Sequence, residues 1–180
     1  IRYAPAGPPG KRRAASAAIM REIACRAETR HRGSWSRIPP MIVMKLDAGS
    51  MGSADRLRDV ARLVQQHLSR KPVVVTSALP NVTDLLLQGA HEAKARSGEY
   101  EDRLAQLKDE HEKVARGLVA EGPGRRRLLG HVGALVDELR TYYTAVYSLE
   151  ELTPRTLDAV AAIGERLSCE LAVAALVNEG

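Results

Sequence analysis

Hydrophobic and polar residues follow two periods along the chain, and these periods predict a short sheet followed by helices. The apolar run MIVMKL from Met41 ends at Gly49-Ser50, which predicts a strand and a turn. Residues 54–70, ADRLRDVARLVQQHLSR, repeat apolar positions every three or four residues, as an amphipathic helix does. The inward positions of this helix are Leu57, Val60, Ala61, Val64 and Leu68.

A second strand is predicted at 73–75, where the sequence reads VVV. Lys71-Pro72 ends the preceding helix, because proline has no amide hydrogen to donate. A continuous apolar run is typical of a parallel strand that is covered on both faces. Strand, helix and strand therefore predict a βαβ unit with a right-handed crossover.

Four further helices are predicted after the turn-rich residues 76–84, TSALPNVTD. Asn81 or Thr83 is expected to cap a helix that begins near Asp84. The pattern then predicts helices over 99–121, from GPGRRR to about Ser148, and from Thr153-Pro154 to about Leu176. The inward positions of the helix over 99–121 and of the helix that follows GPGRRR are Leu104, Leu107, His111, Val114, Leu118, Leu128, Leu129, Val132, Leu135, Val136, Leu139, Tyr142, Tyr143 and Val146. Gly180 is a helix-ending residue at a point where a fold of this kind would continue.

Composition indicates a globular domain with an aliphatic core, since 44% of the 180 residues are hydrophobic and Phe is absent. The net charge of +5 is concentrated in residues 1–40, which hold nine Lys or Arg and two Glu. That leader is basic and is expected to be disordered or to be translated upstream sequence, and it also resembles a transit peptide in composition. The remaining 140 residues carry a net charge of −2, which argues against nucleic-acid binding by the folded part.

Two cysteines, Cys25 and Cys169, are too few for a disulfide framework and lie in no zinc-binding pattern. Their number indicates a reducing compartment, and we expect a cytoplasmic protein. No apolar run reaches the ~20 residues that cross a bilayer, so no membrane partner is expected.

Three segments lie where an α/β sheet usually places its site, at strand ends and the helix starts beside them. They are Lys45 with Gly49-Ser50, the residues 77–83, and Gly164-Glu165-Arg166. Each also has a plain structural interpretation when taken alone. Lys45 can be a solvated edge charge, Ser77 and Thr83 ordinary turn and cap residues, and Glu165 a solvent-facing acid.

In order and spacing, these segments resemble the aspartate kinases of the amino-acid kinase family. That family reads K-F-G-G-T-S-V, then V-S-A-x-x-x-V-T-D/N, then L-T-P-R-x-x-D-A-x-x-x-x-G-E-R-L-S. This chain reads KLDAGSMGSADRLRDVARLV, then PVVVTSALPNVTDLLL, then ELTPRTLDAVAAIGERLS. The resemblance covers residues 41–180 and implies the N-terminal portion of a three-layer αβα sandwich, helix-rich, with residues 1–40 as a separate leader.

The resemblance implies transfer of the γ-phosphoryl group of ATP, with Mg²⁺, to the β-carboxylate of L-aspartate, in lysine, threonine and methionine biosynthesis. Lys45 matches the catalytic lysine, and Gly49 and Ser50 match the phosphate-facing turn. Ser77, Thr83 and Glu165 match residues that bind aspartate, while no metal ligand is assigned to this chain. A homo-oligomer is implied for the full-length protein. Arg155 and Arg166 are assigned to ion pairs on the helix surface and His111 to a half-buried structural position.

The chain departs from the family at F-G-G-T, which is replaced by Leu46-Asp47-Ala48-Gly49. Ala48 adds a side chain where close approach to phosphate favours glycine. Asp47 adds like-charge repulsion of about 1–4 kcal/mol at a separation of ~4 Å from a phosphate. The family's nucleotide pocket and catalytic aspartate are also expected beyond residue 180. We therefore expect little activity from the chain by itself, and two alternatives stay open: an inactive regulatory or assembly partner of a kinase, and a nucleic-acid binder that acts through residues 1–40.

Overall fold

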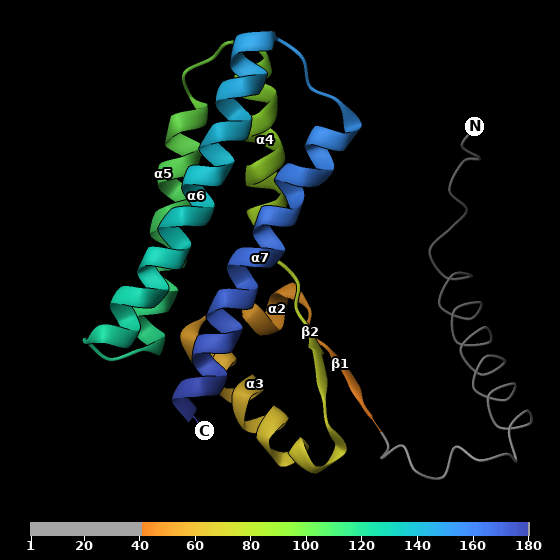
Figure 1. Ribbon diagram of the computed structural model, residues 1–180, viewed down its shortest axis with the longest axis vertical. Helices are drawn as coiled ribbons and strands as arrows, with labels where there is room; N and C mark the ends of the chain where they lie inside the picture. Colours follow the sequence, from red (N-terminus) through yellow and green to blue (C-terminus); the bar gives the residue numbers. More distant parts are fainter. Residues whose placement is uncertain (1–40, 180) are drawn as a thin grey trace, which may run out of the picture. The chain divides into compact units, whose positions relative to one another are not determined.

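The computed structural model describes residues 41–179, and Figure 1 shows a small sheet and a group of long helices. Residues 1–40 and Gly180 lie outside the described part, as do the predictions made for the basic leader and for Gly180 as a helix-ending residue. The elements in chain order are β1 (Val43–Lys45), α2 (Ala48–Met51), α3 (Ala54–Gln66), the 3-10 turn η1 (Leu68–Arg70), β2 (Val73–Val75), α4 (Val82–Lys94), α5 (Tyr100–Leu118), α6 (Pro123–Leu149) and α7 (Pro154–Glu179).

The two strands run parallel, with Val43 opposite Val73 and Lys45 opposite Val75. Because α3 lies between them in the sequence, β1, α3 and β2 form the βαβ unit that was predicted. The fold is therefore helix-rich with a small parallel sheet, as the α/β class predicts.

One face of this sheet is covered and the other is not. Val74 packs against the core, whereas Val43, Val73 and Val75 are 65%, 45% and 42% exposed. The prediction that β2 is covered on both faces is wrong for the described residues. A continuous apolar run reports a strand's tendency to be buried, but burial of both faces also requires a second layer of helices. Among residues 41–179, helices pack on one face only.

Helix α3 begins with a side-chain cap, since the Ser53 hydroxyl accepts a hydrogen bond from the amide of Arg56. Leu57, Ala61 and Val64 are buried, as the helical period predicts. The prediction for Leu68 is wrong, because this residue is 61% exposed. The helix ends at Gln66, and Leu68 belongs to the following 3-10 turn, where the period of the α-helix no longer applies.

Helix α4 begins at Val82, two residues before the predicted start. Asn81 occupies the cap position with φ of 66°, a left-handed conformation that asparagine tolerates, but its side chain makes no capping hydrogen bond. Thr83 is exposed in the first turn of the helix rather than at its cap.

Helices α5, α6 and α7 lie close to their predicted bounds, and α7 continues three residues beyond Leu176. Helix α7 packs against α3, α4, α5 and α6, and α5 packs against α3, α4, α6 and α7, so these two helices contact all the other long helices of the described part. The residues that were predicted to face inward are buried or half-buried in α5 and α6. The core contains mostly Leu, Val and Ala, and its largest fully buried side chains are Tyr143, Met51, Leu57, Leu86, Leu104, Leu107, Leu139, Ile163, Leu167 and Leu171. Among the described residues, no helix combines the length and apolar character needed to span a membrane.

Candidate functional site

The first two predicted segments meet at the carboxyl ends of β1 and β2. The amide of Leu46 donates to the Val75 carbonyl at 2.8 Å, which extends the pairing of the strands by one residue. The Ser77 hydroxyl then donates to the carbonyl of Leu46 at 2.9 Å. Ser77 therefore lies directly beside the residue that follows Lys45, as adjacent parallel strands require.

The loop after β2 also contacts the turn that follows α2. A Cβ placed on Gly52 would lie 3.2 Å from Cγ of Pro80, which is closer than most side-chain contacts. Glycine at this position allows the loop of Ser77 and Pro80 to lie against the backbone of the first segment. The two segments therefore share a second contact besides the hydrogen bond of Ser77.

The third segment reaches the second through Gly164 of α7. A Cβ on Gly164 would lie 3.1 Å from Cβ of Ala78 and 3.2 Å from Cγ1 of Val82. Because residue 164 has no side chain, α7 approaches the loop between β2 and α4 closely at this point. Figure 1 shows α7 passing next to the loop that leads from β2 toward α4. All three predicted segments are therefore connected by direct contacts.

The side chains of Lys45 and Glu165 are both exposed. Lys45 shares the open face of the sheet with Val43, because alternate residues of a strand point the same way. Glu165 follows Gly164 on α7 and makes no hydrogen bond or ion pair with another described residue. The segments that carry Lys45 and Glu165 are therefore linked through the loop after β2. That the two charged side chains bind one ligand stays a prediction.

Asp47 is the cap of the short helix α2. Its Oδ1 accepts hydrogen bonds from the amide of Ser50 at 2.8 Å and from the hydroxyl of Ser50 at 2.7 Å. These bonds, first the one from the hydroxyl and then the one from the amide, lower the pKa of Asp47 below its ordinary value. The carboxylate is thus the anion that these two donors bind in the folded chain.

This arrangement decides how well the loop fits a phosphate. Ser50 is the residue that matches the phosphate-facing turn, and both of its donors are already occupied by Asp47. In this arrangement Ser50 has no free donor for a phosphate group of ATP, so the loop is expected to bind ATP poorly, in agreement with the repulsion expected from Asp47.

A shallow depression of about 420 Å³ lies beside the loop, and Asp47, Gly49, Ser50, Arg56 and Asp59 are among its lining residues. Arg56 donates from Nη1 to the carbonyl of Gly49, so its guanidinium lies at the loop. Sequence reasoning missed Arg56, and the only signal for it was its position in the first turn of the helix that follows the loop.

Three other predicted positions have clear outcomes. Arg166 forms a two-pronged ion pair with Glu138, with N–O distances of 2.6 and 2.8 Å, so its assignment to the helix surface is confirmed. The ion pair predicted for Arg155 is absent, since this exposed residue pairs with no described acid. His111 is structural as predicted, but it is fully buried rather than half-buried. Among residues 41–179, no group of three or more His, Cys, Asp or Glu is placed to hold a metal ion.

Comparison of the sequence with known proteins identifies the family of this chain. The sequence profile of the amino acid kinase family matches residues 40–180. The chain belongs to the amino acid kinase family.

Curated relatives in this family are aspartokinases. A chloroplastic bifunctional aspartokinase/homoserine dehydrogenase of Daucus carota is 31% identical over 132 residues, which are 72% of this chain and 14% of the relative. The chloroplastic bifunctional aspartokinase/homoserine dehydrogenase 1 of Zea mays is 29% identical over 138 residues, which are 77% of this chain and 15% of the relative. An aspartokinase of Schizosaccharomyces pombe is 28% identical over 148 residues, 77% of this chain and 28% of the relative. The chain thus spans less than a third of each of these relatives, and its predicted similarity to aspartate kinases is confirmed.

Proposed function

We propose that this chain is part of an aspartate kinase, which transfers a phosphoryl group from ATP to the β-carboxylate of L-aspartate. The observation that carries the proposal is the contact of Gly164 with Ala78, together with the hydrogen bond from Ser77 to Leu46. These contacts bring together the three segments that resemble aspartate kinases. The names of the amino acid kinase relatives support the same reaction.

The roles of individual residues follow from the resemblance. We propose Lys45 as the catalytic lysine, Gly49 and Ser50 as the phosphate-facing turn, and Ser77, Thr83 and Glu165 as ligands of aspartate. An exposed carboxylate next to Gly164 is free to pair with the ammonium group of an amino acid, which a molecule without that group does not offer. Mg²⁺ would enter with ATP.

The wider context is proposed on the same basis. Residues 41–180 form the N-terminal part of the kinase domain, and the whole domain is a three-layer αβα sandwich. Residues 1–40 are a basic leader. The protein is a homo-oligomer in its full-length form and acts in lysine, threonine and methionine biosynthesis. We propose the cytoplasm as its compartment, although the names of the plant relatives place those proteins in chloroplasts.

A second candidate function rests on Asp47. Because its carboxylate takes both donors of Ser50, the chain is expected to bind ATP poorly and to make little acyl phosphate. An inactive kinase-like protein that regulates or assembles with an intact kinase fits the same observation.

Repair of the loop separates the two candidates. A full-length protein that contains this chain and its variant with Leu46→Phe, Asp47→Gly, Ala48→Gly and Gly49→Thr are each titrated with Mg²⁺-ATP by calorimetry. Both are also incubated with ATP, Mg²⁺, aspartate and hydroxylamine, which traps the acyl phosphate as a hydroxamate. Relief of the repulsion is expected to tighten ATP binding by about tenfold or more in the variant.

The outcomes differ between the candidates. Tighter ATP binding by the repaired loop favours a damaged kinase, and equally weak binding by both proteins favours the partner function. Strong hydroxamate formation by the full-length protein with the unaltered loop contradicts the argument from Asp47.

A further inference from the structure

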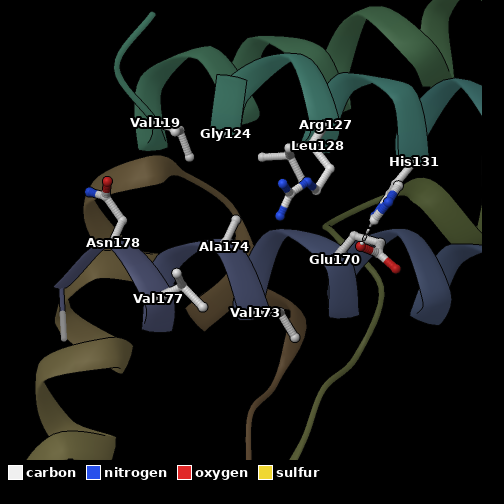
Figure 2. A pocket seen from close by; sticks show the side chains of 10 residues that line it. All are labelled: Val119, Gly124, Arg127, Leu128, His131, Glu170, Val173, Ala174, Val177 and Asn178. Atoms are coloured by element: carbon white, nitrogen blue, oxygen red, sulfur yellow. Dashed lines mark hydrogen bonds and ion pairs between the residues drawn. The ribbon is translucent and has the colours of Figure 1, made fainter. Parts of the chain in front are cut away.

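A pocket of about 290 Å³ lies between the first half of α6 and the second half of α7 (Figure 2). None of its lining residues belongs to the three segments of the candidate site. The pocket is therefore separate from the residues of the candidate site.

The walls of the pocket are mainly apolar. Leu128 of α6 is buried and Ala174 of α7 is half-buried, while Val173 and Val177 of α7 are 51% and 77% exposed. Figure 2 shows Leu128 and Ala174 in the space between the two helices, whereas Val173 projects from α7 away from α6. Small residues keep this space open, because Gly124 has no side chain and Ala174 has only a methyl group. Exposed valines around a hollow of this kind favour a ligand with an aliphatic body.

The polar groups of the pocket differ in whether they have a partner. Glu170 is engaged, since its Oε2 lies 2.8 Å from Nδ1 of His131. Arg127 points from α6 into the space between the helices, and it forms no hydrogen bond or ion pair with any described residue. Its neighbour Arg125, by contrast, donates to the carbonyl of Val119. The pocket thus combines mainly apolar walls with one guanidinium group, that of Arg127, that is available to a ligand.

We propose that this pocket binds a small aliphatic carboxylate, with its hydrocarbon chain against Leu128, Ala174 and Val177 and its carboxylate on Arg127. A guanidinium presents paired N–H donors that match the two oxygens of a carboxylate. A volume near 290 Å³ is at the lower end of ligand pockets, which suits an acid of about five to eight carbons. An amine of the same length would place its charge against Arg127, and inorganic phosphate lacks the apolar body.

Calorimetric titration of the 180-residue chain tests the proposal with hexanoate, hexanol, hexylamine and inorganic phosphate as probes. Hexanoate is expected to bind saturably with a Kd of about millimolar, as its few heavy atoms allow. Hexanol is expected to bind about tenfold more weakly, and hexylamine and phosphate more weakly still. Equal binding of hexanoate and hexylamine, or binding of phosphate as tight as that of hexanoate, would overturn the assignment.

Two variants and a matched control locate the binding. Arg127→Gln should weaken hexanoate binding about tenfold, and Ala174→Leu, which fills the apolar part, should abolish it. Arg126→Gln removes the adjacent arginine, which is exposed and lines no part of the pocket, so it should leave binding unchanged. Circular dichroism checks that each variant retains its helices. If hexanoate does not saturate the unaltered chain, or if the Arg127 and Arg126 variants bind alike, the proposal is wrong.

Discussion

Gly164 and Ala78 lie so close together that a Cβ on residue 164 would stand 3.1 Å from the Cβ of Ala78. The same Cβ would stand 3.1 Å from Cδ1 of Leu86 and 3.2 Å from Cγ1 of Val82. All three neighbours are buried, so none of them has an open direction in which to move. This contact connects α7 to the loop that follows β2.

Gly164→Ala is therefore expected to destabilise the fold despite the better helix propensity of alanine. Crowding of a well-packed core costs about 1–3 kcal/mol. Urea unfolding followed by circular dichroism measures the change. Gly130→Ala is the matched control, because a Cβ at that helical position meets no atom within 4 Å, and it should be neutral or stabilising. Equal stability of the two variants would show that α7 does not depend on the close approach.

Much of this fold can be predicted from the sequence where one local pattern is strong. Leu104, Leu107 and His111 repeat at helical steps in α5, and the helix forms around them. The run of three valines predicts a strand correctly but not which of its faces is covered. Which face is covered depends on elements that are distant in the sequence. Val73 and Val75 are accordingly more exposed than expected for an apolar run.

The candidate site was predicted as three segments, and their contacts depend on tertiary packing that one sequence does not encode locally. The place of Ser77 follows from parallel pairing, since the ends of adjacent strands meet. The contact of Gly164 with Ala78 has no local signal beyond the small size of both residues. Asp47 was correctly identified as a departure, but its role as the cap bound by Ser50 depends on the turn that α2 forms.

Ser77 is expected to stabilise the end of the sheet as well as to serve the proposed site. Its hydroxyl donates to the Leu46 carbonyl at 2.9 Å in a half-buried position, so Ser77→Ala leaves that carbonyl with one partner fewer. The expected loss in the free energy of unfolding is about 0.5–1.5 kcal/mol. Ser69→Ala is the control in chemical unfolding, because Ser69 is exposed in η1. A Ser77 variant as stable as the control would exclude a structural contribution.

Tyr143 of α6 makes a buried hydrogen bond to α4. Its hydroxyl donates to the carbonyl of Leu86 at 2.7 Å, and burial raises the pKa of Tyr143. Tyr143→Phe should lower the free energy of unfolding by about 1 kcal/mol, since the Leu86 carbonyl loses its side-chain partner. The adjacent Tyr142 makes no hydrogen bond with a described residue, so Tyr142→Phe should change stability by less. Thermal unfolding compares the two, and a larger effect at residue 142 would contradict the assignment.

Glu165 tests the substrate part of the proposed function. If its carboxylate pairs with the ammonium group of aspartate, Glu165→Gln should weaken aspartate binding about 10- to 100-fold. Proton–nitrogen spectra recorded during an aspartate titration measure this without any need for activity or ATP. Glu121→Gln makes the same chemical change at an exposed residue between α5 and α6 and should leave binding unaltered. Equal affinities of the two variants for aspartate would show that Glu165 does not bind this substrate.

His111 makes the stability of the fold depend on pH. Its ring is fully buried, with Nδ1 2.7 Å from the Leu107 carbonyl and no partner for Nε2 among the described residues. Burial lowers the pKa of His111 below 6.5, against smaller opposing effects of the Leu107 carbonyl and Glu110. The unfolded chain therefore takes up a proton before the folded chain does, so stability is complete above pH 6.5 and falls as the pH drops from there toward the lowered pKa. Urea unfolding at several pH values between 8 and 5 should show this loss in the unaltered chain and in the exposed-site control His91→Gln. In His111→Leu the part of the slope due to this ring should disappear, and a slope identical to that of the control would assign the pH dependence to other groups.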